Sequence, residues 1–287
     1  MKLLGRSAMI TGASQGLGRE IARQFVREGA SVLLVARSGD TLLEAEAELR
    51  SMVTSDNQLV LSHAGDVSDP ETCEQIAADA FRSFGGLTVL VNNAGIQSAF
   101  GPIEETPRTE WEQVFRVNLF GPYYLCRELI PRMLQQGYGK IVNLSGGGAT
   151  KPLRGLSAYA ASKAALVRLT ENLALDLRGS GIDVNAIAPG ALNTRMLDEV
   201  IAAGPRKVGQ ESYEVALQQR ESGGSPPERA AELAVFLASS ASDGITGRLI
   251  SAVWDDWQSL PERREELQAS EVYTLRRITP EDRGLSW

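Results

Sequence analysis

Short apolar runs alternate with helical patterns along this chain, and that alternation limits the folds open to it. One helical pattern begins at Asp69-Pro70, where a capping side chain is followed by proline at the first helical position. Apolar strands joined through helices predict a parallel sheet covered by helices on both faces. We therefore expect an α/β fold with a doubly wound sheet of about seven strands. The runs that predict strands are residues 7–10, 31–36, 58–62, 88–92, 140–145, 182–187 and 248–253.

A glycine-rich turn, Thr11-Gly-Ala-Ser-Gln-Gly-Leu-Gly18, lies between the first apolar run and a helical pattern. Glycines let the backbone turn tightly and approach a pyrophosphate closely. The start of the following helix supplies N–H donors and a positive dipole for phosphates. The spacing is Gly-x-x-x-Gly-x-Gly, and by itself it also fits a plain turn in an α/β protein. A dinucleotide site is favoured once a second motif is considered.

That second motif is Tyr159-x-x-x-Lys163, with Ser145 fourteen residues before the tyrosine. On a helix the Tyr and Lys side chains share one face, one turn apart. A free phenol has a pKa of about 10, and a nearby ammonium is expected to lower it. Ser145 can hold an alcohol or carbonyl oxygen against the phenol. The three residues together predict a proton-transfer site for an alcohol/carbonyl couple.

With these motifs in this order, residues 3–252 resemble the classical short-chain dehydrogenase/reductase (SDR) family, which has a Rossmann-type fold. Further matches are Asp66-Val67, Asn92-Asn-Ala-Gly95, Asn118 and Pro189-Gly190 with Thr194. The resemblance implies one catalytic domain, residues 1–257, that exchanges hydride between a nicotinamide dinucleotide and a ketone or alcohol. Residues 258–287 depart from the family pattern and form a C-terminal extension of unknown role.

The resemblance also implies roles for the matching residues. Tyr159 is the acid/base, Ser145 holds the reacting oxygen, and Lys163 lowers the phenol pKa and binds the nicotinamide ribose. Asn118 positions a water that links Lys163 to solvent. The residues expected to bind the cofactor are Gly12, Ser14, Gln15, Gly16, Leu17, Gly18, Arg37, Ser38, Asp66, Val67, Asn93, Ala94, Gly95, Tyr159, Lys163, Pro189, Gly190 and Thr194.

Cofactor preference is expected to depend on Ala36-Arg37-Ser38, at the end of the second predicted strand. A carboxylate there would bind the ribose hydroxyls of NAD and repel a 2′-phosphate. Arg37 can instead hold the 2′-phosphate of NADP with charge-assisted hydrogen bonds. Gln15 stands where many relatives carry a basic residue, which weakens this argument slightly. We expect NADP(H) to be preferred, with NAD(H) as the alternative.

The substrate is expected to lie against residues 97–100, 146–153 and the segment after Gly190. The stretch 193–227 contains two glycine- and proline-rich turns and is predicted to form a mobile lid. An apolar wall and an open pocket predict a mid-sized, uncharged or weakly polar substrate. The residues assigned to substrate binding are Phe100, Gly146, Leu153, Leu192 and Met196.

Composition agrees with an enzyme of this kind. A net charge of −7 gives no sign of nucleic-acid binding. His63 is the only histidine, so no metal site is predicted. Cys73 and Cys126 cannot make a disulfide framework. No apolar run is long enough to span a membrane, and no signal peptide is recognised, so a cytoplasmic enzyme is expected.

A homotetramer or homodimer is expected, because the helices around residues 111–134 and 157–177 resemble those that the family packs against a partner. Two other functional classes remain open. One is a regulatory protein that binds a cofactor without turnover, against which the intact Ser145, Tyr159 and Lys163 argue. The other is a sugar-nucleotide epimerase or dehydratase, which usually has a longer C-terminal substrate domain and a differently spaced glycine loop.

Overall fold

A seven-stranded parallel sheet forms the centre of the protein, and the computed structural model describes residues 1–286. The strand order is β3-β2-β1-β4-β5-β6-β7, as expected for a doubly wound sheet. The chain runs outward from β1 to β3 and then crosses back to β4, so a crevice opens beyond the carboxyl ends of β1 and β4. The strands are β1 (Ser7–Thr11), β2 (Ser31–Ala36), β3 (Val60–Ala64), β4 (Val89–Asn92), β5 (Gly139–Leu144), β6 (Ile182–Ala188) and β7 (Leu249–Ser251).

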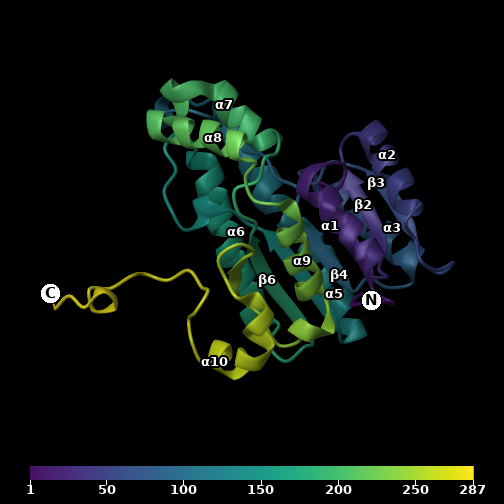
Figure 1. Ribbon diagram of the computed structural model, residues 1–287. Coiled ribbons are helices and arrows are strands. Elements are labelled where there is room, and N and C mark those ends of the chain that lie inside the picture. Colours follow the sequence, from purple (N-terminus) through teal and green to yellow (C-terminus); the bar gives the residue numbers. More distant parts are fainter. Residues whose placement is uncertain (287) are drawn as a thin grey trace.

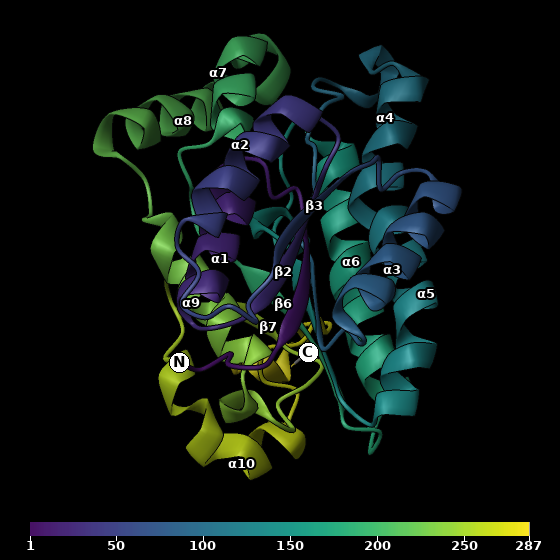
Figure 2. The same ribbon diagram turned by 90° about the vertical axis from the view of Figure 1, so that its right-hand side faces the viewer.

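Helices cover both faces of the sheet (Figure 2). One face carries α1 (Gly16–Arg27), α2 (Gly39–Arg50) and α9 (Pro227–Ala238). The opposite face carries α3 (Pro70–Phe84), α5 (Gly121–Gln136) and α6 (Ser157–Asp176). The central strands are therefore apolar on both sides, and the two helical layers bury separate hydrophobic clusters against them.

Local sequence explains where α3 begins and ends. The Asp69 carboxylate accepts a hydrogen bond from the Thr72 backbone N–H at 2.9 Å, and Pro70 occupies the first turn, where no N–H is needed. The helix ends at Gly85, whose φ of 69° is a left-handed conformation that glycine adopts without strain. The start agrees with the sequence prediction.

The segment between β6 and α9, which was predicted to form a lid, is a helical cap above the carboxyl ends of the strands. Helices α7 (Arg195–Val208) and α8 (Gln210–Ser222) lie together at one end of the molecule (Figure 1). Gly204 interrupts α7 with a φ of 75° and a ψ of 167°, just before Pro205. On the other side of the crevice, α4 (Arg108–Phe115) continues through a π-helical turn, Arg116–Phe120, into α5.

The chain after β7 first packs against the domain and then extends away from it. A 3-10 helix (Trp257–Arg263) and α10 (Arg264–Gln268) bury Leu260 and Leu267 in the main core. The Arg248 guanidinium donates to the carbonyl oxygens of Leu267, Ser270 and Val272, the last at 2.7 Å. Beyond residue 275 the chain extends away from the domain (Figure 1). Short 3-10 helices complete the structure at Ile103–Glu105, Gly147–Ala149, Ser240–Ser242 and Glu281–Arg283.

Replacing Arg248 by methionine should lower the free energy of unfolding by about 3 kcal/mol, because three tail carbonyls lose a charged donor. Protease cleavage within residues 264–286 should also become faster. Arg178→Met is the matched control, because the exposed Arg178 makes no side-chain hydrogen bond or ion pair with residues 1–286. Denaturant unfolding of the two variants that gave equal losses would contradict the anchoring role of Arg248.

Candidate active site

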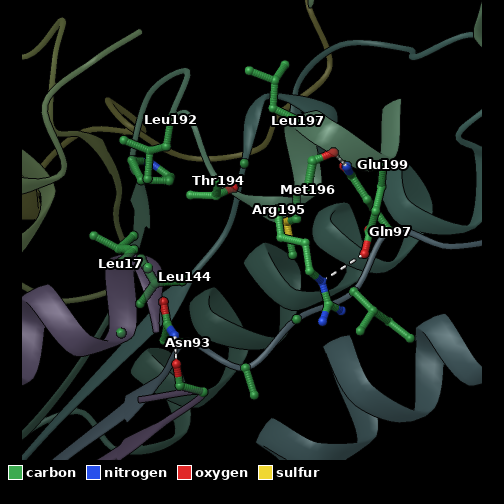
Figure 3. Close-up of a pocket in the computed structure, with 18 of the residues that line it drawn as sticks. Leu17, Asn93, Gln97, Leu144, Leu192, Thr194, Arg195, Met196, Leu197 and Glu199 are labelled. Atoms are coloured by element: carbon green, nitrogen blue, oxygen red, sulfur yellow. Dashed lines mark hydrogen bonds and ion pairs between the residues drawn. The ribbon is translucent and has the colours of Figure 1, made fainter. Parts of the chain in front are cut away.

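One large cavity lies over the carboxyl ends of β1, β4, β5 and β6, with a volume of about 1150 Å³. Ligand pockets usually measure about 300–1,000 Å³, so this cavity has room for more than one small molecule. It extends from the turn after β1, past the end of β5, to the cap formed by α7 and α8. Figure 3 shows side chains from these separate segments facing the same space.

The glycine-rich turn makes the floor of the cavity. Gly12 and Gly16 have φ values of 66° and 57°, which side chains rarely adopt. A Cβ on Gly18 would collide with the Gly12 carbonyl oxygen and the Asn93 amide. Asn93 Nδ2 donates to the carbonyl oxygens of Thr11, at 2.9 Å, and Gly12, at 3.2 Å. The backbone at the start of α1 thus has no side chain at Gly12, Gly16 and Gly18, which allows the close approach that a pyrophosphate requires.

One end of the crevice lies at the carboxyl ends of β2 and β3. Arg37 and Ser38 line it immediately before α2, so the N-terminus of a second helix points at the same place. Arg37 is exposed and makes no side-chain hydrogen bond or ion pair with residues 1–286, and the Ser38 hydroxyl does not cap α2. Asp66 and Val67 line the opposite wall. These groups fit the adenosine half of a dinucleotide, which agrees with the cradle at Gly18.

Ser145, Tyr159 and Lys163 meet at the other end of the cavity. Ser145 follows β5, and the other two lie on the first two turns of α6. The Tyr159 hydroxyl lies over Gly146, where an added Cβ would be only 2.6 Å from it. The Ser145 hydroxyl is buried and has no hydrogen-bond partner among the described residues. A buried hydroxyl without a partner has an unused hydrogen-bonding position, which a ligand oxygen can satisfy.

Burial shifts the pKa values of both Lys163 and Tyr159. It lowers the pKa of Lys163 to about 8 and raises the pKa of Tyr159 to about 12. Lys163 Nζ donates to the Leu144 carbonyl oxygen at 2.6 Å and lies 5.9 Å from the Tyr159 ring centroid. The sequence suggested a lowered phenol pKa, whereas the pKa of Tyr159 is raised here, because burial of the hydroxyl disfavours the phenolate. Tyr159 is a protonated acid at neutral pH.

Asn118 lies on the π-helical turn and is fully buried. Its side chain pairs with both backbone groups of Ile96 at 2.9 Å and donates to the Ser162 hydroxyl at 3.0 Å. It therefore ties the loop after β4 to α6, and it does not line the cavity. The water-positioning role that the family resemblance suggested for Asn118 stays a prediction.

Most of the residues predicted for the cofactor and substrate come together in this one cavity. Every predicted cofactor residue lines it, as do Gly146, Leu153, Leu192 and Met196. Phe100 does not line it; Ala99, just before it, has a φ of 70° and is buried against Val114 and Ala158. The sequence predicted that the segment after Gly190 borders the substrate, but it assigned only Leu192 and Met196 from that segment to substrate binding. Further lining residues from this segment are Asn193, Arg195, Leu197, Glu199, Val200, Ser212, Val215, Ala216 and Gln219, and Thr41 lines the cavity from α2.

No second chemical centre competes with this one in the described part of the chain. His63 Nδ1 lies 3.0 Å from the Asp79 carboxylate at the sheet edge, away from the cavity residues. Residues 1–286 contain no group of three or more potential metal ligands. Within the same residues, none of the helices combines the length and the apolar character that a membrane span needs.

Comparison with known proteins agrees with the geometry. A family model described as "short chain dehydrogenase" matches residues 6–203. A 2-dehydro-3-deoxy-L-rhamnonate dehydrogenase (NAD(+)) of Sphingomonas sp. (strain SKA58) is 36% identical over 196 residues, covering 68% of this chain and 76% of that protein. Levodione reductase of Leifsonia aquatica is 34% identical over 241 residues, covering 83% of this chain and 89% of that protein.

Solved structures show the same likeness in three dimensions. A crystal structure of NAD+-bound xylitol dehydrogenase superposes with a TM-score of 0.80 at 28% identity, covering 88% of this chain and 98% of that one. Three features occur together on this fold: the glycine-rich turn that ends at Gly18, the unpartnered Ser145 hydroxyl, and the Tyr159/Lys163 pair. By its sequence and by its fold, the chain belongs to the short-chain dehydrogenase/reductase family of oxidoreductases.

Proposed function

We propose that this protein interconverts a ketone and an alcohol with NADP(H) as the preferred cofactor and Tyr159 as the acid/base. The observation that carries the proposal is the unpaired, buried Ser145 hydroxyl beside the Tyr159 hydroxyl, above Gly146. A carbonyl oxygen placed between the two hydroxyls would accept a hydrogen bond from each. Both donors would then stabilise the negative charge that develops on that oxygen.

A nicotinamide cofactor, when bound, supplies or accepts the hydride at the carbonyl carbon. The protein's own task is to hold the substrate oxygen and to move one proton. In reduction, the protonated Tyr159 gives its proton to the oxygen, and Ser145 keeps the oxygen in place. The Lys163 ammonium then stabilises the phenolate that remains, since opposite charges favour the ionised form. Oxidation of an alcohol follows the same path in reverse.

Replacing Tyr159 by phenylalanine should lower turnover by about 10²- to 10⁴-fold, because the ring remains and only the transferable proton is lost. Cofactor affinity, measured by fluorescence titration, should stay close to wild type. Tyr138→Phe is the matched control: its hydroxyl lies at the opposite end of the sheet, 3.5 Å from Asp243. A Tyr159→Phe enzyme with more than about a tenth of the wild-type rate would remove the residue from the acid/base role.

The NADP preference rests on charge at the end of β2. Arg37 is exposed and unpaired among the described residues, and no carboxylate from residues 36–41 lines the cavity. The start of α2 adds a positive dipole and the free Ser38 hydroxyl. A 2′-phosphate there would gain a guanidinium and a helix N-terminus, whereas the ribose hydroxyls of NAD would meet no carboxylate from residues 36–41.

Arg37→Ala should weaken NADP(H) binding by roughly 10- to 150-fold, since a charge-assisted hydrogen bond contributes about 1.5–3 kcal/mol. NAD(H) binding should hardly change and serves as the internal control. The wild-type preference should also shrink as salt rises, because the site is exposed and therefore screened. Equal weakening of both cofactors would mean that Arg37 supports the loop rather than reading the phosphate, and tighter wild-type binding of NAD(H) would overturn the preference.

The substrate is proposed to be a mid-sized, uncharged or weakly polar ketone or the corresponding alcohol. The names of the relatives include a levodione reductase and a xylitol dehydrogenase, one a ketone reductase and the other an alcohol dehydrogenase. An absorbance assay of NADPH and NADH consumption across a panel of ketones tests the proposal directly. A protein that binds cofactor but reduces no member of the panel would instead favour the regulatory alternative.

Assembly into a homodimer or homotetramer is part of the proposal. Phe120, Tyr123 and Leu175 expose apolar side chains on the outer surface of α5, α6 and the turn before α5. Ala161 also faces outward, while Ala158 is buried in the core. Closed symmetric pairing of such helix faces is the commonest way in which soluble enzymes bury this kind of surface.

Light scattering should therefore give a mass of at least twice the chain's 30.9 kDa across the micromolar range. Tyr123→Glu should lower that mass, because a carboxylate would be buried in the contact. Val215→Glu, on the exposed part of α8, is the control and should leave the mass unchanged. A wild-type mass equal to one chain at every concentration would disprove the assembly.

A further inference from the structure

Gln97 lines the active-site cavity but has no role in the proton-transfer chemistry described above. It follows β4 by five residues and is 6% exposed. Its Nε2 donates a hydrogen bond to the carbonyl oxygen of Met196, in the first turn of α7 (Figure 3). The bond joins two segments that are 99 residues apart in the chain. A buried amide that is fixed by a single carbonyl has a defined orientation.

That orientation leaves the other end of the amide available. Gln97 Oε1 accepts no hydrogen bond from the described residues, and it is not sealed from solvent as the unpartnered buried atoms are. Since Gln97 lines the cavity and is otherwise buried, the cavity is the side from which a ligand can reach this oxygen. Met196 uses one of the two N–H donors of the amide, so Oε1 is the acceptor that this position offers to a ligand.

The loop that carries Gln97 is held on both sides. Before it, the Ile96 backbone is bonded in both directions by Asn118. After it, Gly101 N donates to the Gly155 carbonyl oxygen at 3.0 Å, just ahead of the helix that carries Tyr159. The acceptor is therefore pre-organised, so a ligand that uses it does not have to order the loop.

Met196 connects this acceptor to the reacting groups. A Cβ built on Gly95 would lie 3.5 Å from both Met196 Cε and Lys163 Nζ, so these two side chains face the same small space. Met196, whose carbonyl oxygen accepts the Gln97 hydrogen bond, therefore also borders the space beside Lys163. A ligand group at Gln97 Oε1 lies within the same cavity as Ser145 and Tyr159.

We propose that Gln97 determines specificity by accepting a hydrogen bond from a hydroxyl group that the substrate carries near its reacting carbonyl. The substrate class is then a hydroxy ketone, or the corresponding diol, rather than a simple ketone. This inference rests on the proposed reductase function and narrows its substrate. A ketone without the hydroxyl leaves Gln97 Oε1 unpaired once water is excluded, which is a cost that the hydroxy ketone avoids.

The test compares matched substrates in one enzyme. A ketone that the wild type reduces is paired with its derivative that carries a hydroxyl on the first or second carbon from the carbonyl. Wild-type kcat/KM should favour the hydroxy ketone, and Gln97→Met should reduce that preference by roughly 2- to 13-fold, the worth of one neutral hydrogen bond. The pH dependence of kcat should not change, because Tyr159 is untouched.

A binding measurement complements the kinetics. The hydroxy ketone should raise the melting temperature of the wild type more than the parent ketone does, and Gln97→Met should remove that difference. Gln136→Met is the matched control, because Gln136 Nε2 also donates to a backbone carbonyl, that of Leu87 at 3.0 Å, far from the cavity. It should alter stability without altering the substrate ratio.

The possible outcomes distinguish a failure of the Gln97 proposal from a failure of the proposed reductase function. A wild-type enzyme that reduces no ketone refutes the proposed function. An enzyme that reduces ketones but does not distinguish the matched pair, or whose preference survives Gln97→Met, refutes the role of Gln97 alone. Equal loss of the preference in Gln136→Met would assign the effect to general destabilisation and would also refute it.

Discussion

The close packing of the loops after β1 and β4 is the contact on which the rest of the site depends. Thr11 Oγ1 accepts hydrogen bonds from the backbone N–H groups of Asn93 and Ala94, both at 3.0 Å, while the Asn93 side chain returns bonds to Thr11 and Gly12. No side chain fits at Gly18 because the Gly12 carbonyl and the Asn93 amide already occupy that space. The loops after β1 and β4 therefore leave backbone groups, not side chains, to face a phosphate at Gly18. The same hydrogen bonds fix the start of the loop that leads to Gln97.

Burial, rather than ion pairing, shifts the pKa values of Lys163 and Tyr159. Lys163 has a pKa of about 8 in the folded protein, below its unfolded value of about 10.4. Between those two pH values the unfolded chain binds more protons, so this group makes the folded state more stable as the pH rises. Below pH 8 the buried ammonium is a constant cost to the folded state. Ligand hydroxyls that solvate the ammonium would relieve that cost, which links Lys163 to binding as well as to proton transfer.

Local patterns were sufficient to predict the sheet, the glycine cradle and the Ser145, Tyr159 and Lys163 trio, because each depends on neighbours in sequence. The two edge strands differ most from the prediction: β3 lies two residues later, at 60–64 rather than 58–62, and β7 is shorter, at 249–251 rather than 248–253. The environment of Asn118, the pKa direction of Tyr159 and the lining contributed by α8 depend on which distant segments pack together. Single-sequence patterns do not contain that information. Phe100 illustrates the point, since the left-handed backbone at Ala99 redirects the chain just before it.

The tail illustrates how an edge of the sheet can be closed without adding a strand. Leu249 N donates to the Tyr273 carbonyl oxygen at 2.8 Å, so the outer edge of β7 is already used within one chain. Exposed strand edges invite pairing with other chains, and a covered edge does not. Edge-to-edge pairing of two copies would have to displace Tyr273, whereas the apolar side chains on α5 and α6 remain accessible. Leu275 also packs with Ala149, Val167 and Ala186, beneath the loop that carries Ser145. The segment after β7 therefore supports the active-site loop from behind as well as closing the sheet edge.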